Sequence, residues 1–302
     1  MADSMSKLIK RIRNYTYKKE DLVAPANAIQ HTGESLVLNG EPIRATHTAM
    51  RHLCIHAKIP ADFFMNRLLP EEQIPIFNRM FSALDTEFMF RLSNKTLYGV
   101  VSPKYSIMDN IVLVDILKAA DELGLGLKPV KSVLNPDHTK IRLIYEHARV
   151  GELVPMLELT NSENGMGSLV LWAGIYRYVC SNGLLIPVTT TQSRWIHYGA
   201  DAIDIPDFHA VLDESVRYVH MLDQARTDYL SAEGKMSLIQ DVSSKFSGRV
   251  ADAVTSAANH EYHGAPTRFH FVNAVTRAAQ TFEPAQQTCM ESYAHTLLLK
   301  AS

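Results

Sequence analysis

The chain has 302 residues, enough for one large core or two smaller ones. Its net charge of −2 excludes a wholly basic nucleic-acid coat but allows a local basic groove. Three cysteines without paired spacing argue against a disulfide scaffold and a structural zinc site, and they fit a reducing cytoplasm. No apolar run suits a signal peptide or a membrane span, so we expect a soluble, cytoplasmic protein without a membrane partner.

The first twenty residues form a basic arm. Six cations stand there against two acids: Lys7, Lys10, Arg11, Arg13, Lys18 and Lys19. Such an arm is either a solvated terminus or a contact for an acidic partner such as nucleic acid, and the pattern leaves both open.

Helical signals follow the arm. Residues 46–58 carry apolar side chains at helical spacing, and Pro60 ends that segment and begins another short helix. Pro70 and the acids after it stand where a helix N-terminus favours them, which predicts a helix over 70–83. We therefore expect residues 1–85 to be a basic arm and a mostly helical region.

The predicted secondary structure changes from helices to strands at Glu87. Residues 88–93 and 97–101 are short, aromatic and β-branched, and Asn94-Lys95 between them predicts a hairpin. A helix is expected over 110–123, because Ser106 and Asp109 form a start signal and Gly124 a stop signal. Turn residues then separate three predicted strands that form a meander, at 127–134, 139–147 and 153–161. Residues 86–200 are thus expected to be a mixed α/β core.

The remainder, 201–302, is expected to be a helical region packed on that core. Its first part, 201–233, is acidic and has helical periodicity, and further helices are expected within 237–258 and over 267–282. The fold class is therefore α+β, an antiparallel β-meander backed by helices with helical N-terminal and C-terminal regions.

Motifs for catalysis or cofactors are weak. His52 and His56 are four residues apart and share a helix face with metal-ligand spacing, but no acid lies between them and no third ligand is near. No Walker-type phosphate loop occurs, and Gly165-Met166-Gly167 is only half of a dinucleotide fingerprint. We therefore predict no metal, no cofactor and no enzymatic activity, and Cys180 in its apolar block is expected to be inert.

Cations interleaved with tyrosines run through the mixed core. Lysine and arginine side chains can follow a phosphate backbone while aromatic rings stack on bases, which is what single-strand binding requires. The same residue types also pack sheets and protect strand edges. The candidates for backbone contact and stacking are Lys104, Tyr105, Lys131, Lys140, Arg142 and Arg177.

Three blocks carry a family resemblance. Residues 92–110, the run 158–168 leading into 176–184, and Asn273-Ala274-Val275-Thr276 resemble, in order, the motifs of the phage- and plasmid-borne family called domain of unknown function 932. The resemblance covers roughly 45–280. Pro103-Lys104 stands where the family usually has Asp-Arg, and Arg277-Ala278-Ala279 where it has an acid and an aromatic. The resemblance implies a phage or plasmid protein in a bacterial host cell and no particular activity.

A more distant resemblance suggests a mechanism. A helix, a meander and a predicted helix bearing Tyr176, Arg177 and the Asn182-Gly183-Leu184 ending are similar to the core of Erf-type (essential recombination function) single-strand annealing recombinases. Such proteins assemble as rings or filaments and hold a strand in a basic groove. On residue types alone, Tyr176 could instead pack on the sheet while Arg177 pairs with Glu158 or Glu163.

The sequence thus leads to one main hypothesis and two alternatives. The main hypothesis is an ATP-independent protein that binds and anneals single-stranded DNA in recombination or replication, acting as a homo-oligomer. One alternative is a protein that binds and neutralises a defence or regulatory factor of the host through the acidic 201–233 segment. The other is an enzyme on nucleotides or nucleic acid with the histidines at its site.

Overall fold

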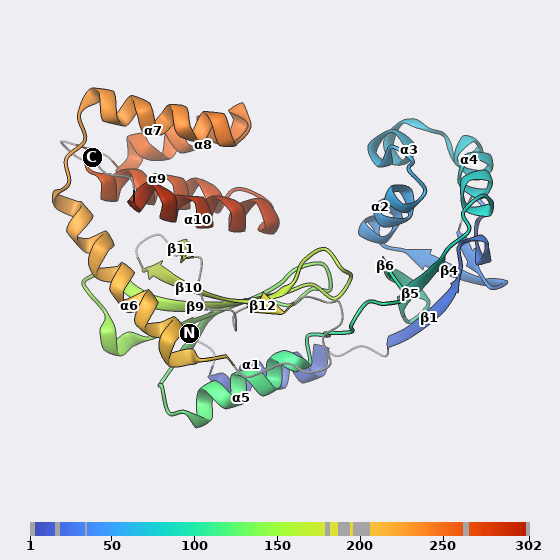
Figure 1. The fold of residues 1–302 in the computed structure, drawn as a ribbon, viewed down its shortest axis with the longest axis horizontal. Helices are drawn as coiled ribbons and strands as arrows, with labels where there is room; N and C mark the ends of the chain where they lie inside the picture. The colour runs from blue at the N-terminus through green and yellow to red at the C-terminus, as the bar shows by residue number, and fades with distance from the viewer. Residues whose placement is uncertain are drawn as a thin grey trace.

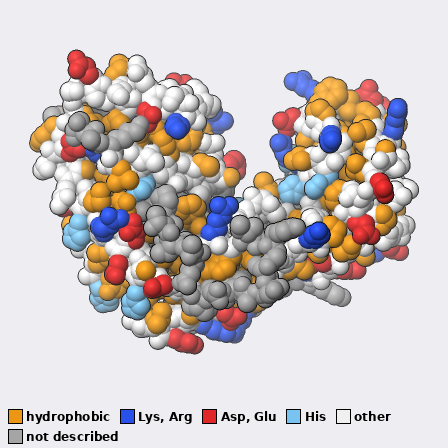
Figure 2. All heavy atoms as spheres, in the orientation of Figure 1, with side chains coloured by type: hydrophobic (Ala, Val, Ile, Leu, Met, Phe, Trp, Pro, Cys, Tyr) orange, Lys and Arg blue, Asp and Glu red, His pale blue; other side chains and the backbone are white. Residues whose placement is uncertain are grey.

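The computed structural model describes residues 4–15, 19–33, 35–178, 182–186, 194–195, 206–261 and 266–299. Figure 1 shows a larger body and a smaller N-terminal lobe, and Figure 2 shows the surface hollowed between them. The chain begins in the larger body with α1 (Met5–Tyr15), passes into the lobe and returns. We call residues 19–101 the N-terminal lobe, and α1 with the described residues from 106 onward the larger body.

The N-terminal lobe is a sheet of six strands covered by three helices. The strands run in the order β1-β5-β6-β4-β3-β2, and all neighbours are antiparallel except β4 and β6. The strands are β1 (Lys19–Pro25), β2 (Ile29–His31), β3 (Leu36–Leu38), β4 (Glu41–Ala45), β5 (Glu87–Ser93) and β6 (Thr96–Val101). The helices are α2 (His47–His56), α3 (Ala61–Arg67) and α4 (Pro70–Ser82). Phe77 stacks on Phe81 in the shared core, with 4.4 Å between the ring centroids.

The predicted helices 46–58 and 70–83 and the hairpin around Asn94-Lys95 are confirmed in this lobe. The expectation that residues 1–85 are mostly helical is wrong for residues 19–45, which hold β1 to β4. These strands are short, so alternation of apolar residues barely registers in them. The hairpin β5–β6, which was expected in the mixed core, belongs to the sheet of the N-terminal lobe.

The larger body is built on a second sheet, a meander in the order β11-β10-β9-β8-β7, with β12 also paired to β10. All of these pairs are antiparallel. The strands are β7 (Lys128–Val133), β8 (Thr139–Ile144), β9 (Leu153–Asn161), β10 (Leu169–Arg177), β11 (Asn182–Ile186) and β12 (Arg194–Trp195). The predicted three-stranded meander is therefore confirmed and continues into further strands.

The expectation of a helix bearing Tyr176 and Arg177 is wrong, because both residues belong to β10. Alternate residues of this strand, Leu169, Leu171 and Ala173, are fully buried in the main core, whereas Val170 and Trp172 are only half-buried. This period of two is the signature of a strand. Residues 179–181, including Cys180, lie outside the described residues.

Helices cover both faces of the second sheet (Figure 1). On one side lie α1 and α5 (Val112–Glu122), on the other α9 and α10, while α6 flanks β9 and β10. The C-terminal helices are α6 (Phe208–Gln224), α7 (Ala232–Lys245), α8 (Gly248–Glu261), α9 (Arg268–Ala279) and α10 (Pro284–Leu299). Short 3-10 turns occur at Ala26–Ala28, Glu146–Ala148 and Ala225–Thr227. The protein is therefore α+β, with its C-terminal region helical over the described residues.

Residues 5–15 of the basic arm form an amphipathic helix, Lys18 lies outside the described residues, and Lys19 begins β1. Met5, Leu8 and Ile12 of α1 are buried in the main core, and the helix packs on α5. Its cations Lys7, Lys10, Arg11 and Arg13 are exposed. Within the described residues, no helix is both long and apolar enough to cross a bilayer.

Candidate nucleic-acid interface

Two of the predicted contact residues, Lys140 and Arg142, are buried. They lie on β8 under α10, with exposed fractions of 3% and 0%. Arg142 Nε is 2.5 Å from Glu158 Oε2 and its Nη2 is 2.5 Å from Glu291 Oε2, while Lys140 Nζ is 3.6 Å from Glu158 Oε1. Burial alone would lower the pKa of Arg142, but the two carboxylates raise it above its ordinary value. A single strand of DNA on the surface cannot reach either cation. The structure therefore corrects the prediction that Lys140 and Arg142 contact nucleic acid.

Arg177 also makes contacts within the protein. Its Nε is 3.0 Å from Glu152 Oε2, and its guanidinium lies 5.4 Å from the centre of the Phe269 ring. Glu152 also binds Arg226 at 3.0 Å, so one carboxylate links the end of β10 to the turn after α6. Arg177 therefore holds elements together, although its partner is neither Glu158 nor Glu163.

Lys131 lies on β7, an edge strand of the second sheet, and is exposed. It pairs in register with Arg142. Partial burial lowers its pKa, as do the positive charges of Arg142 and Lys140. Arg11 of α1 donates to Ser132 Oγ at 3.0 Å beside it. Because successive residues of a strand point to opposite faces of the sheet, Lys131 is a surface cation on the face opposite to Arg11 and the other cations of α1.

Lys104 and Tyr105 follow β6, where the chain crosses from the N-terminal lobe to the larger body. Lys104 is exposed, and its backbone N–H donates to Ser102 Oγ at 3.2 Å. Tyr105 is half-buried, and its ring lies 5.7 Å from the guanidinium carbon of Arg91. The structure therefore brings a surface cation and an aromatic ring together at the junction of the two parts.

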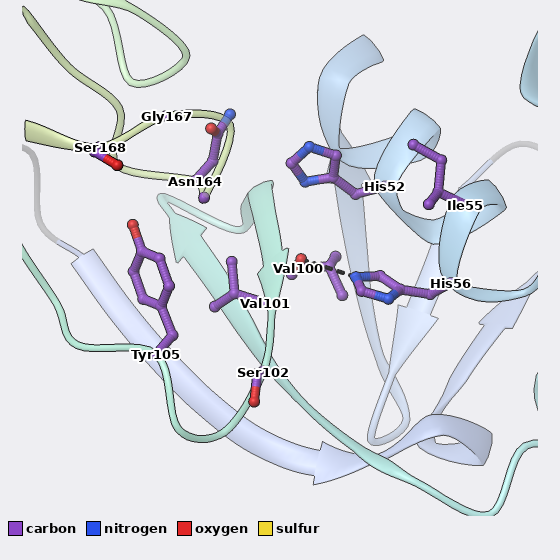
Figure 3. Close-up of a pocket in the computed structure, with 11 residues that line it drawn as sticks. His52, Ile55, His56, Val100, Val101, Ser102, Tyr105, Asn164, Gly167 and Ser168 are labelled. Carbon is purple, nitrogen blue, oxygen red and sulfur yellow. Dashed lines mark hydrogen bonds between the residues drawn. The ribbon is translucent and has the colours of Figure 1, made fainter. Parts of the chain in front are cut away.

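A cavity of about 510 Å³ opens at this junction. One wall belongs to the N-terminal lobe, with His52 and His56 from α2 and Val101 from β6. Tyr105 and the loop between β9 and β10, which carries Asn164, complete the lining. In Figure 3 the ring of His52 points from α2 toward that loop, and the ring of Tyr105 faces the same space from the opposite side. Residues distant in sequence thus form one concave site.

A buried ionic network fixes the junction behind this cavity. The fully buried guanidinium of Arg91 on β5 donates to Asp21 Oδ1 of β1 at 2.9 Å, to Asp109 Oδ1 at 2.9 Å and to the backbone carbonyl of Glu163. Lys19 Nζ lies 2.7 Å from Glu163 Oε1 and 3.0 Å from Asp109 Oδ2. These contacts join β1 and β5 of the lobe to the loop that lines the cavity, so the site has a rigid base.

A second bridge crosses the cavity wall itself. Asp137, in the turn between β7 and β8, accepts from Thr48 Oγ1 of α2 at 2.6 Å and from Asn164 Nδ2 at 2.6 Å. Asn164 is fully buried, and its carbonyl oxygen accepts from Ser162 Oγ at 2.7 Å. One carboxylate therefore clamps α2 to the loop on the opposite wall.

The two histidines of the cavity differ in their hydrogen bonds. His56 Nε2 donates to the backbone carbonyl of Val100 at 3.2 Å. Burial lowers the pKa of His52, His56 lowers it further, and Asp137 opposes the shift, so His52 is neutral at pH 7. Among the described residues, no donor or acceptor pairs with the buried Nδ1 of His52. The cavity thus contains a neutral imidazole with unmet hydrogen-bonding capacity.

Arg194 is a further cation at the cavity that the candidate set from the sequence did not include. It is exposed on β12, and its Nε donates to Ser168 Oγ, which lines the cavity, at 3.4 Å. The dipeptide Arg194-Trp195 combines a cation and an aromatic, as the other candidates do. Its place beside Ser168 follows only from the pairing of β12 with β10.

The acids of the 201–233 segment fall into two groups. Glu214 pairs with Arg217, Asp223 with Arg226 and Asp228 with Arg268, whereas Asp207, Asp213 and Glu233 are exposed. Residues 201–205 lie outside the described residues. Over the part of the chain that is described, no three His, Cys, Asp or Glu side chains are grouped closely enough to hold a metal ion.

Comparisons with known proteins bear on the family alone. The family model described as Domain of unknown function (DUF932) matches residues 97–297. Neither the comparison with curated proteins nor the comparison with solved structures gave a match. The matched residues include Tyr105, Asn164 and Arg194 of the site, while His52 and His56 precede them. Because the match spans about two thirds of its length, the chain belongs to the Domain of unknown function (DUF932) family.

Proposed function

We propose that this protein binds single-stranded DNA without ATP and anneals complementary strands during the recombination or replication of a phage or plasmid. The observation that carries the proposal is the junction between the lobe and the larger body. There the exposed cations Lys104 and Arg194 stand next to a cavity that Tyr105 lines. Lys131 on β7 adds a third surface cation.

Physical chemistry connects this arrangement to a single strand. Lysine and arginine contacts to phosphates release counterions and give sequence-independent affinity. An aromatic ring beside them can stack on any base, because every base has a flat face. The near-neutral net charge means that such affinity must come from a local arrangement of cations.

We further propose that the protein works as a homo-oligomer, a ring or a filament. Three surface cations of one chain can hold only a short piece of strand. The dependence of log K on log salt for three contacts to a single strand has a slope of only about −2. Annealing of longer strands therefore needs several copies side by side.

The proposal is tested by fluorescence anisotropy with a labelled single-stranded oligonucleotide at several salt concentrations. We expect binding at low salt that weakens as salt increases. Lys104→Ala, Arg194→Ala and Lys131→Ala should each weaken binding and make the salt slope shallower by about 0.7. Lys245→Ala is the matched control, because Lys245 is an exposed cation at the end of α7, outside the junction.

Annealing and assembly are measured on the same samples. Complementary strands with a fluorophore and a quencher should pair faster with the protein than without it, in the absence of ATP. Particle images should show rings or filaments when single-stranded DNA is present. A protein that shifts no single strand at low salt and does not accelerate annealing contradicts the proposed function.

A further inference from the structure

Strand binding through surface cations leaves the chemistry of the cavity itself unexplained. Its volume of about 510 Å³ falls within the range of sites for small organic ligands. The lining is mixed, with the apolar side chains of Val100, Val101 and Ile55 beside His52, Tyr105 and Ser168. Apolar walls with a few polar groups at the edges suit a flat heteroaromatic ring.

The charge of the lining decides between a phosphate and a neutral ligand. Among the described residues that line the cavity there is no lysine or arginine. The carboxylate of Asp137 stands on this wall, where Thr48 and Asn164 hold it. An anion inside would therefore lie near a negative charge without a cation partner, whereas Lys104 and Arg194 are outside, on the exposed surface. The interior thus favours a neutral group and the rim favours a phosphate.

One polar atom inside needs a partner. Nδ1 of His52 is buried and has no hydrogen-bond partner within the described part of the chain. A buried polar group without a partner is costly, and native proteins rarely leave one unpaired. The ring lines the cavity (Figure 3), but Nδ1 itself has almost no open surface, so a ligand there can pair with it only once the imidazole turns.

Glycines keep the cavity wall close to the strand beneath it. Gly165 has a φ of +85°, and a Cβ built on it would lie 2.9 Å from Val101 Cγ1. A Cβ on Gly99 of β6 would lie 2.9 Å from the Cβ of Asn164. The loop that carries Asn164 therefore lies directly on β6, and the space between this loop and α2 is a preformed slot.

We propose that this cavity binds one nucleobase of the strand, turned out of the stack, with the sugar-phosphate backbone outside on Lys104 and Arg194. The base lies against Tyr105 and the valines, and its polar edge pairs with His52. This inference rests on the proposed function, because it assigns the base contact of the same strand. A free nucleoside has the same ring chemistry, so the test includes both sources.

The first measurement removes the base and keeps the backbone. Short single-stranded oligonucleotides carry one abasic residue, moved through every position in turn. We expect about tenfold weaker binding when the abasic residue occupies the position that enters the cavity, since stacking of one base on an aromatic side chain has roughly that value. The salt slope should not change, because the phosphates are intact.

Two variants change the cavity without removing a cation. Ile55→Trp adds bulk at a side chain that is 63% exposed and lines the cavity, so it blocks the cavity and leaves the core intact. His52→Phe keeps a planar ring and removes its hydrogen-bonding nitrogens. Ile55→Trp should erase the difference between intact and abasic oligonucleotides, and His52→Phe should reduce it. The matched control Lys104→Ala should lower affinity and salt slope but keep that difference.

Free nucleosides separate this inference from the proposed function. Titration with adenosine, cytidine, guanosine and thymidine should shift NMR signals of the cavity residues in the wild type and not in Ile55→Trp. If nucleosides bind and no strand does, the proposed function is wrong and the base site stands. If abasic and intact strands bind equally and no nucleoside binds, the base site is wrong whether or not strands bind.

Discussion

Lys140 and Arg142 have the charge that a DNA contact needs, but the fold places both between β8 and α10. Every residue of β8 is buried, on both faces of the strand. The alternation of side chains along the strand therefore could not show whether a cation faces the protein interior or the solvent. Their partner Glu291 lies about 150 residues later in the chain, and no local sequence pattern predicts that pairing. By contrast, Lys104, Tyr105 and Lys131 lie at or near the surface as the sequence suggested.

Arg142→Ala should therefore act on stability. Removing one partner of a buried ion pair leaves Glu158 and Glu291 uncompensated, which costs about 3–5 kcal/mol of unfolding free energy. Urea unfolding followed by circular dichroism measures this loss. Lys245→Ala should change the unfolding free energy by no more than about 0.5 kcal/mol. If both variants are equally stable, the buried network under α10 does not exist in solution.

At the scale of elements, the main wrong prediction is a helix in place of β10. Its bulky apolar run and the Asn182-Gly183 pair after it resemble a helix with its C-terminal stop, whereas the structure pairs Arg177 with Asn182 in an antiparallel register. The sequence also contains the pair Asn39-Gly40, which lies between β3 and β4 with positive φ at both residues. An Asn-Gly pair between apolar residues is a strong hairpin signal, and it indicates strands in the N-terminal region.

The contact between β6 and the loop after β9 can be tested at one glycine. Gly99→Ala should destabilise the protein by about 1–3 kcal/mol, because the added methyl group meets Asn164 at 2.9 Å and pushes β6 and the loop apart. The same substitution at Gly248, where nothing lies within 4 Å, is the control and should be neutral or slightly stabilising. Equal urea midpoints for the two variants would contradict the close packing at the junction.

The whole molecule consists of two parts joined by charged contacts. The arrangement of these parts could be predicted least well from the sequence. The α+β class, the meander and the helical C-terminal region follow from local patterns. The cavity does not, because single side chains such as Arg91 and Asp137 bring together α2, the segment after β6 and the loop after β9. Long-range pairing of single side chains leaves no periodic trace in a sequence.

Buried histidines predict how stability depends on pH. Burial lowers the pKa of His31, His52, His138 and His295 from the ordinary value of 6.5. Below pH 6.5 the unfolded chain therefore binds protons that the folded protein does not, so the unfolding free energy falls as pH decreases. The melting temperature should drop steadily from pH 7.5 to 5.5. Replacing the exposed His209 with Gln should leave this slope unchanged, and a flat wild-type profile would contradict the burial of the four rings.

Photo-crosslinking tests the central claim, that single-stranded DNA lies across the junction, most directly. An oligonucleotide that contains 5-iodouracil is bound at low salt and irradiated, and adducts are located by mass spectrometry of tryptic peptides. We predict adducts on the peptide 105–118, which begins with Tyr105, and their loss in the variant Tyr105→Leu. Adducts confined to α7 and α8, or none at all on a protein that holds the strand, would show that the strand binds elsewhere.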